Sequence, residues 1–254
     1  MTQKEKAELF KSLHVKGSPV ILFNIWDAGS ARTIEQAGAK AIATGSWSVA
    51  AAHGFDDGES IPLPLVLTNI KRITESVALP VTLDFETGYA TELSGLKENI
   101  RQVIAAGAIG INFEDRIIGA DDLQTIEDQS ARIKAVRQAA DETSVPLFIN
   151  ARTDVFLKTY PAPHNDAELE EALRRADAYA GAGASGLFAP GLRDPELIEK
   201  LCERSPLPVN ILVLPDTPPT KTMAQLGVAR ISYGAGPYRQ MTQALTEAAQ
   251  KAFL

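Results

Sequence analysis

Short apolar runs alternate with amphipathic segments along most of the chain. The runs are rich in Val, Ile and Leu and are bounded by Gly, Pro or polar residues, as expected of buried strands. The segments between them carry apolar residues at three- and four-residue spacing and end at Gly or Pro, which predicts helices. The predicted strands lie at residues 19–27, 39–46, 80–86, 108–115, 145–154, 184–191, 207–215 and 228–234.

This alternation predicts the α/β class, because strands that are apolar on both faces need helices on both sides of a parallel sheet. Eight strands in 254 residues fit a (β/α)8 barrel, or TIM barrel, and we expect a single domain over residues 1–254. The alternative is a doubly wound open sheet. Its dinucleotide-binding form needs a Gly-x-Gly-x-x-Gly turn, which the sequence lacks, so the barrel is favoured.

Composition narrows the range of partners. The chain has 32 acidic residues against 25 Lys and Arg and no basic block, so we expect no nucleic-acid surface. One cysteine, Cys202, excludes an intramolecular disulfide and a cysteine-rich metal site. With no apolar signal-peptide core and no run of membrane-spanning length, we expect a cytoplasmic protein that does not enter a membrane.

Polar side chains gather at the ends of the predicted strands. The stretch PVTLDFETGY, residues 80–89, brings two carboxylates to the end of one strand just before a glycine. Because the carboxyl ends of barrel strands converge on one mouth, the other strand-end groups should lie near them. These groups are Asn24, Asp27, Asp56, Asp57, Glu59, Asp84, Glu86, Asn112, Glu114, Asp115, Asn150, Arg152 and Asp154.

Four of these acids, Asp57, Asp84, Glu86 and Glu114, would share a small volume. Crowded carboxylates repel one another and call for a cation. Oxygen ligands suit Mg²⁺ (or Mn²⁺), which keeps several waters, so one direct carboxylate with others acting through water is a natural arrangement. The alternative is that the acids pair with nearby basic side chains or cap the following helices.

Arg152 would lie inside the barrel, where a guanidinium needs an anionic partner: either a substrate carboxylate, phosphonate or enolate, or a structural acid such as Glu114. The segment TGSWSV, residues 44–49, offers backbone N–H groups that could hold an anion. His53 has no evident nucleophile beside it. Cys202 falls in a helical segment and reads as a packing residue.

Four motifs in order, GSWSVAAAHGFDD, LDFETGY, INFEDR and NARTDVFL, resemble the isocitrate lyase and phosphoenolpyruvate mutase superfamily. The similarity covers nearly the whole chain. It implies a (β/α)8 barrel whose last helix is often exchanged between subunits, and hence a homodimer or homotetramer. It also implies a small carboxylate substrate and a lyase that works through an enolate.

The resemblance implies roles for individual residues. Asp84 would be the direct magnesium ligand, and Asp57, Glu86 and Glu114 would act on the metal largely through water. Arg152 would contact substrate oxygens, and Arg152, Glu114 and Asp57 are the expected catalytic residues. The backbone amides of Ser46 and Trp47 would hold a substrate anion, and Tyr233 occupies the aromatic position after strand eight.

Three departures from the superfamily pattern leave the reaction open. Asp-x-Asp is replaced by Asp84-Phe85-Glu86, and the segment after strand four lacks both the Lys-Lys-Cys-Gly-His loop of the lyases and the lid motif of the phosphonomutase. We expect a magnesium-dependent lyase or decarboxylase that cleaves a C–C bond in a small 2-oxo or 2-hydroxy carboxylate. The alternatives are a P–C bond enzyme of the phosphonopyruvate mutase or hydrolase type, and a non-catalytic metabolite-binding barrel.

Overall fold

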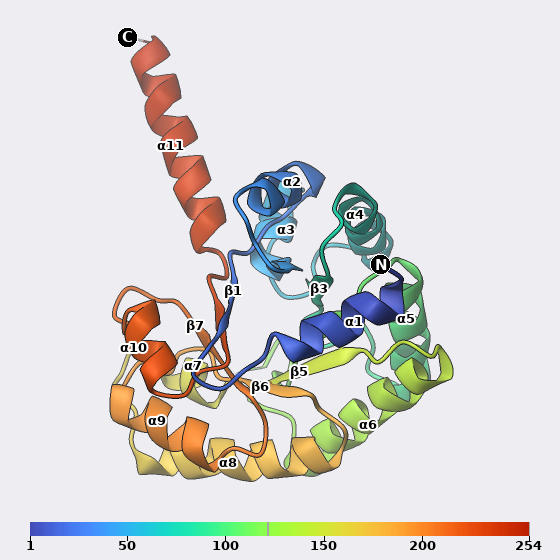
Figure 1. Cartoon of the computed structure of the whole chain (residues 1–254), viewed down its shortest axis with the longest axis vertical. Helices are drawn as coiled ribbons and strands as arrows, with labels where there is room; N and C mark the ends of the chain where they lie inside the picture. Colours follow the sequence, from blue (N-terminus) through green and yellow to red (C-terminus); the bar gives the residue numbers. More distant parts are fainter. Residues whose placement is uncertain (121, 254) are drawn as a thin grey trace.

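The computed structural model describes residues 1–120 and 122–253. All eight strands are parallel and follow the order β1-β8-β7-β6-β5-β4-β3-β2 in one sheet. A parallel bridge between Ile25 and Thr44 links the two ends of this sheet, so the predicted (β/α)8 barrel is confirmed (Figure 1). The strands are β1 (Val20–Leu22), β2 (Ile42–Ala43), β3 (Val81–Asp84), β4 (Gly110–Glu114), β5 (Phe148–Arg152), β6 (Gly186–Phe188), β7 (Val209–Leu212) and β8 (Arg230–Ser232).

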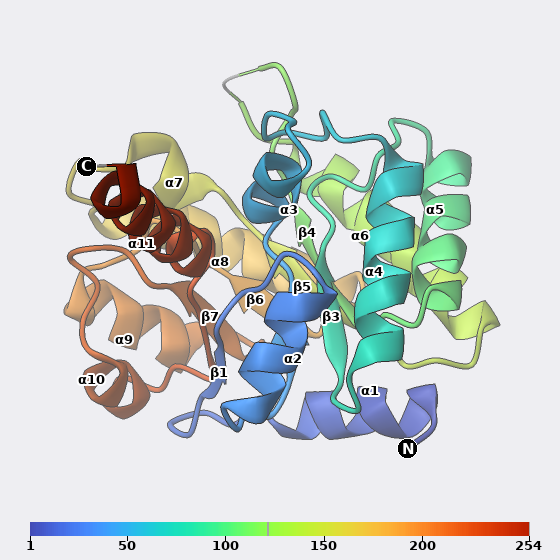
Figure 2. The same cartoon turned by 90° about the horizontal axis from the view of Figure 1, so that it is seen from above.

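Except for the last one, the helices pack around the barrel and bury apolar residues against it. The helices are α1 (Gln3–Ser12), α2 (Ala28–Gln36), α3 (Ser46–Ala52), α4 (Leu63–Ser76), α5 (Leu93–Ala105), α6 (Ile126–Glu142), α7 (Val155–Thr159), α8 (Asp166–Gly181), α9 (Pro195–Arg204), α10 (Thr220–Gln225) and α11 (Gly236–Phe253). Helix α1 lies across one end of the barrel, where the fully buried Phe10 packs edge-on against Phe148. The described residues of the β4–α6 loop, 115–120 and 122–125, project at the opposite end (Figure 2).

Several strands are shorter than predicted, because polar side chains end them early. The first strand stops at Leu22, and Asp27 instead caps α2 by accepting a hydrogen bond from the Ser30 backbone N–H at 2.7 Å. The third strand stops at Asp84, so Glu86 lies in the following turn and not on the strand.

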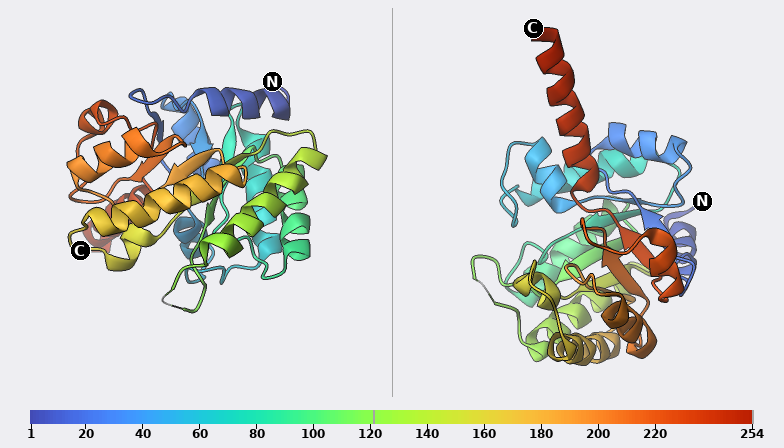
Figure 3. Two further views of the ribbon diagram at one scale, coloured as in Figure 1. Left: turned by 90° about the horizontal axis from the view of Figure 1, so that it is seen from below. Right: turned by 90° about the vertical axis from the view of Figure 1, so that its left-hand side faces the viewer.

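Helix α11 leaves the barrel and projects away from it (Figures 1 and 3). Its apolar residues Met241, Leu245 and Phe253 are exposed, at 37%, 64% and 86% of their surface. The helix therefore carries an apolar face that its own chain does not cover. Among the described residues, no helix is both long and apolar enough to cross a bilayer.

Candidate active site

Two adjoining cavities open at the carboxyl ends of the strands, of about 140 Å³ and about 300 Å³, and they share Ser46, Asp57 and Arg152. The smaller one is lined by Asn24, Gly45, Ser46, Trp47, Asp57, Asp84, Asn112, Arg152, Leu157, Phe188, Pro190, Leu212, Ser232, Gly234 and Ala235. The larger one is lined by Ser46, Asp57, Gly58, Glu86, Glu114, Arg116, Ile118, Gly119 and Arg152. The four predicted acids therefore surround one connected space.

Asp84 is held by three hydrogen bonds that leave one of its oxygens open. Its Oδ2 atom accepts from both the backbone N–H and the hydroxyl of Ser46, each at 2.9 Å. Its Oδ1 atom accepts only from the Asn112 side-chain amide, at 3.2 Å. Because a carboxylate oxygen has two acceptor sites, Oδ1 keeps one for a further ligand.

Asn112 is oriented by the barrel interior. Its carbonyl oxygen accepts from Asn150 at 2.9 Å and from Arg230 at 3.0 Å, so its NH₂ group must face Asp84. Asn112 lies beside Asp84 in the β3–β4 register and is buried. The sequence marked Asn112 as a strand-end residue but gave it no role, because its partner Arg230 is 118 residues away.

Glu86 reaches the site by a strained turn. Its φ is 49°, and Glu59 and Tyr89 also have positive φ, at 57° and 56°. The Glu59 backbone N–H donates to Glu86 Oε2 at 2.8 Å, while Glu59 Oε1 accepts from the backbone N–H groups of Thr87 and Tyr89. Glu86 was predicted at the end of the strand with Asp84, but it is this turn after the strand that brings its carboxylate near that of Asp84.

The acids repel one another in a partly dry space. Burial and the charges of Asp84 and Asp57 raise the pKa of Glu86 to about 8. Partial burial and the charge of Asp84 also raise the pKa of Asp57. Burial raises the pKa of Glu114, and Arg152 offsets only part of that effect. A bound cation would relieve this repulsion.

Arg152 is already well occupied. Its Nε and Nη2 atoms donate to the two oxygens of Asp154 at 2.6 and 2.8 Å, and its Nη1 atom contacts Glu114 Oε2 at 2.7 Å. The charges of Asp154 and Glu114 outweigh the effect of burial and raise the pKa of Arg152. Arg152 can therefore pair with structural acids such as Glu114 and still contact a substrate anion. The guanidinium has five N–H groups, and the acids occupy three of them, so two remain for a ligand.

The other predicted residues divide into two groups. Ser46 and Trp47 line the smaller cavity, although the Ser46 N–H already donates to Asp84 and so is not free for a substrate anion. Tyr233 lies outside both cavities, with its ring 5.0 Å from that of Phe23. Its neighbours Ser232 and Gly234 line the cavity instead, because residues of β8 alternate between inside and outside.

A divalent cation fits this donor set. In residues 1–120 and 122–253, no three His, Cys, Asp or Glu side chains meet closely enough to bind an ion together. A cation that one carboxylate binds directly and the others bind through water needs no such group of three. The open Oδ1 of Asp84 and the repelling acids around it suit that arrangement, and the individual ligands remain predictions.

The fold and the site together define the protein as a (β/α)8 barrel with an acidic cavity at the carboxyl ends of its strands. The sequence model of phosphoenolpyruvate phosphomutase matches residues 10–253. The chain therefore belongs to the phosphoenolpyruvate phosphomutase family, within the isocitrate lyase/phosphoenolpyruvate mutase superfamily of enzymes, and the predicted resemblance is confirmed.

Its relatives span several activities. A Burkholderia cenocepacia J2315 protein, provisionally described as a phosphonomutase, has 48% identity and a TM-score of 0.96, over 99% of this chain and 100% of its own. An uncharacterised protein of Mycobacterium tuberculosis H37Rv is 32% identical over 95% of this chain and 87% of its own. The 2-methylisocitrate lyase of Escherichia coli K12 is 27% identical over 96% of this chain and 83% of its own.

A more distant structure shows the same fold. Phosphonopyruvate hydrolase, solved with oxalate and Mg²⁺, has a TM-score of 0.84 at 21% identity, over 97% of this chain and 86% of its own. An enzyme of the same fold thus binds a divalent metal.

Proposed function

We propose that the protein is a magnesium-dependent lyase or decarboxylase that cleaves a C–C bond in a small 2-oxo or 2-hydroxy carboxylate through an enolate. The observation that carries this proposal is the smaller cavity, which is lined by both Asp84, with its open oxygen, and Arg152, with two N–H groups that no acid occupies. A cation on one side and a guanidinium on the other suit a substrate with a carboxylate beside an oxo or hydroxy group.

The residues of the chain bind and orient this substrate. Arg152 donates to the substrate carboxylate and is kept in place by Asp154. Leu157, Phe188 and Leu212 line the same cavity and exclude water from the bond that breaks. Asp84 would hold a Mg²⁺ ion directly, and Asp57, Glu86 and Glu114 would act on it through water. The ion would supply a Lewis acid for the 2-oxo or 2-hydroxy oxygen.

The nature of the leaving group follows from what the loop beside the site contains. The β4–α6 loop contributes Arg116, Ile118 and Gly119 to the larger cavity, and its sequence has no cysteine or histidine to act as a proton donor. Cys202 is no substitute, because it is buried on α9 and burial raises its pKa to about 12. A leaving group that needs no proton, such as carbon dioxide, is therefore favoured.

The test follows product formation with and without Mg²⁺: pyruvate from oxaloacetate, substituted malates and 2-methylisocitrate, glyoxylate from isocitrate, and loss of the phosphonate from phosphonopyruvate. We expect a 3-carboxylated 2-oxo acid to release pyruvate in a magnesium-dependent way, and isocitrate and 2-methylisocitrate to be inert. Asp84→Asn should abolish this turnover. Asp56→Asn is the matched control, since Asp56 is an exposed acid outside both cavities.

The P–C alternative is favoured by one specific observation, the 48% identity to a protein provisionally described as a phosphonomutase. Turnover of phosphonopyruvate alone would establish it in place of C–C cleavage. A non-catalytic barrel would turn over none of these compounds. It would also fail to exchange the methyl protons of pyruvate with solvent in the presence of Mg²⁺.

We also propose that two copies of the chain associate by exchanging α11. An apolar groove of about 700 Å³ runs between α2 and the start of α11, lined in part by Phe23, Ile34 and Met241. The exposed face of α11 on a second copy, with Leu245 at its centre, is an apolar occupant for such a groove. Light scattering should give a dimer or tetramer for the wild type and a smaller species for Leu245→Asp. A monomeric wild type would contradict the exchange.

A further inference from the structure

A stripe of polar side chains runs along the barrel-facing side of α8. Glu171, Arg175 and Tyr179 follow one another at four-residue spacing, which places them on one face of a helix. Arg175 and Tyr179 are buried, with 7% and 0% of their surface exposed. Packing alone would fill such positions with apolar residues, as Leu169 and Ala172 do nearby on the same helix.

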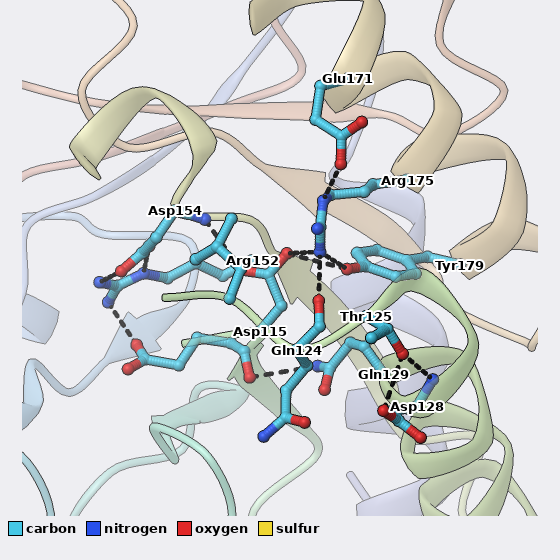
Figure 4. Close-up of polar contacts among 12 residues, drawn as sticks. Asp115, Gln124, Thr125, Asp128, Gln129, Arg152, Asp154, Glu171, Arg175 and Tyr179 are labelled. Atoms are coloured by element: carbon cyan, nitrogen blue, oxygen red, sulfur yellow. Dashed lines mark hydrogen bonds and ion pairs between the residues drawn. The ribbon is translucent and has the colours of Figure 1, made fainter. Parts of the chain in front are cut away.

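The stripe ends on Asp115, the residue directly after β4. Asp115 Oδ2 accepts from Arg175 Nη1 at 2.9 Å and from the Tyr179 hydroxyl at 2.8 Å (Figure 4). Asp115 is fully buried and lines neither cavity, so it does not touch the substrate. We call Asp115, Arg175 and Tyr179 the α8 triad.

One branch of contacts leads from the α8 triad to Arg152. The second carboxylate oxygen of Asp115 accepts the backbone N–H of Asp154 at 3.0 Å. The side chain of Asp154 then holds the guanidinium of Arg152 through both of its oxygens (Figure 4). The position of the substrate-facing arginine therefore depends on a carboxylate that lies outside the site.

A second branch leads to the end of the β4–α6 loop. Arg175 Nη1 donates to the backbone carbonyl of Gln124 at 3.0 Å, and the Gln124 N–H donates to the Asp115 carbonyl at 2.7 Å. Gln124 precedes Thr125, which caps α6 by accepting the Asp128 N–H. The same guanidinium thus fixes the point where the loop joins its helix.

We infer that the α8 triad is a positioning unit that sets Arg152 and the carboxyl-terminal end of the β4–α6 loop together. The two branches meet at the ion pair between Asp115 and Arg175: the first leaves from Asp115 Oδ1 and the second from Arg175 Nη1, so loss of this pair disturbs both. The loop carries Arg116 and Ile118 into the larger cavity, so its placement and the aim of Arg152 are coupled. The inference deepens the proposed function, because it names residues that prepare the same site.

The test uses Tyr179→Phe and Arg175→Lys, with Arg174→Lys as the matched control. Phenylalanine keeps the ring of Tyr179 and removes only its hydroxyl. Arg174 lies on the same helix but is exposed, and among the described residues its ion-pair partner is Glu171, so its replacement repeats the chemical change outside the triad. Urea denaturation first establishes that each variant is folded.

Two readouts do not require turnover. In calorimetry, both triad variants should bind oxalate in the presence of Mg²⁺ at least about tenfold more weakly than the wild type. Such a loss is expected when a supporting hydrogen bond to a binding residue is removed. Trypsin cleavage after the exposed Arg116 should become faster in the same variants, because the far end of the loop is released. Arg174→Lys should match the wild type in both assays.

Turnover supplies the third readout. On whichever substrate releases pyruvate, the triad variants should show a raised KM together with a lowered kcat, whereas a purely structural role would change only the stability. Oxalate affinity and cleavage rates equal to those of Arg174→Lys would overturn the inference. If the wild type turned over no substrate, the proposed function would fail while the binding and proteolysis results would still decide the role of the triad.

Discussion

Replacing Gly88 by alanine tests how the turn after β3 delivers Glu86 to the site. Gly88 has a φ of 94°, a backbone conformation that costs an L-residue about 1–2 kcal/mol. A Cβ atom there would lie 2.5 Å from Leu96 Cδ1 and 3.1 Å from Phe113 Cε2. Leu96 and Phe113 are both fully buried, so neither can move aside without repacking. Crowding of this kind costs about 1–3 kcal/mol.

The two effects together predict a loss of about 2–5 kcal/mol in the free energy of unfolding. For a chain of this length each kcal/mol lowers the Tm by about 2–4 °C. Gly54→Ala is the matched control. Its φ is 78°, yet a Cβ there would meet no described atom within 4 Å, so only the backbone strain applies.

Urea denaturation of both variants separates the crowding from the strain. We expect Gly88→Ala to lose about 1–3 kcal/mol more than Gly54→Ala, with an unchanged m-value. Gly88→Ala should also weaken oxalate binding in Mg²⁺, because Thr87 and Tyr89 on either side of it are held by Glu59. Equal stabilities of the two variants would refute the steric argument.

Three further substitutions test other parts of the structure. Asp84→Asn should abolish calorimetric binding of oxalate with Mg²⁺, because an amide must turn its NH₂ group toward either Ser46 or Asn112 and loses the charge; wild-type affinity would show that Asp84 is not the ligand. Cys202→Ser should leave turnover within about twofold of the wild type, since a buried thiol is inert, and a far larger loss in a folded variant would contradict its packing role. Burial, together with the charge of Arg230, lowers the pKa of His14 to about 3 from 6.5. Below pH 6.5, His14 is protonated in the unfolded chain but stays neutral in the folded chain. The free energy of unfolding therefore falls by about 1.4 kcal/mol per pH unit as the pH is lowered toward 3. His14→Phe should therefore lose about 2 kcal/mol less than the wild type between pH 7 and pH 5, and parallel losses in denaturation curves would contradict this.

The sequence alone determined the barrel. Apolar runs separated by amphipathic segments permit few arrangements, because strands buried on both faces must be parallel and covered by helices. The same reasoning placed five side chains at one mouth of the barrel, because they lie at or after the carboxyl ends of strands that point the same way. They are Asp57, Asp84, Glu86, Glu114 and Arg152.

Only the tertiary structure decided what each of these groups contacts. The aim of Asp84 depends on Asn112, which is fixed by Arg230 on β8, and the aim of Arg152 depends on Asp154. Asn112 and Arg230 are 118 residues apart, so no local pattern relates them. Asp154 is only two residues from Arg152, but it is held in turn by Asp115, which is 39 residues away. Tyr233 shows that a correct position along the chain does not fix where a side chain points. Its position after a strand was correct, but the alternation of side chains turned its ring toward Phe23 and away from the cavity.

Helix α8 shows what the sequence and the tertiary structure each contribute. Glu171, Arg175 and Tyr179 at four-residue spacing are visible in the sequence as a polar stripe, yet a solvent-exposed face would give the same pattern. The fold settled the question by packing α8 against α6 and placing the stripe over Asp115. Periodicity fixes which residues share a face, and the packing of the barrel decides what that face meets.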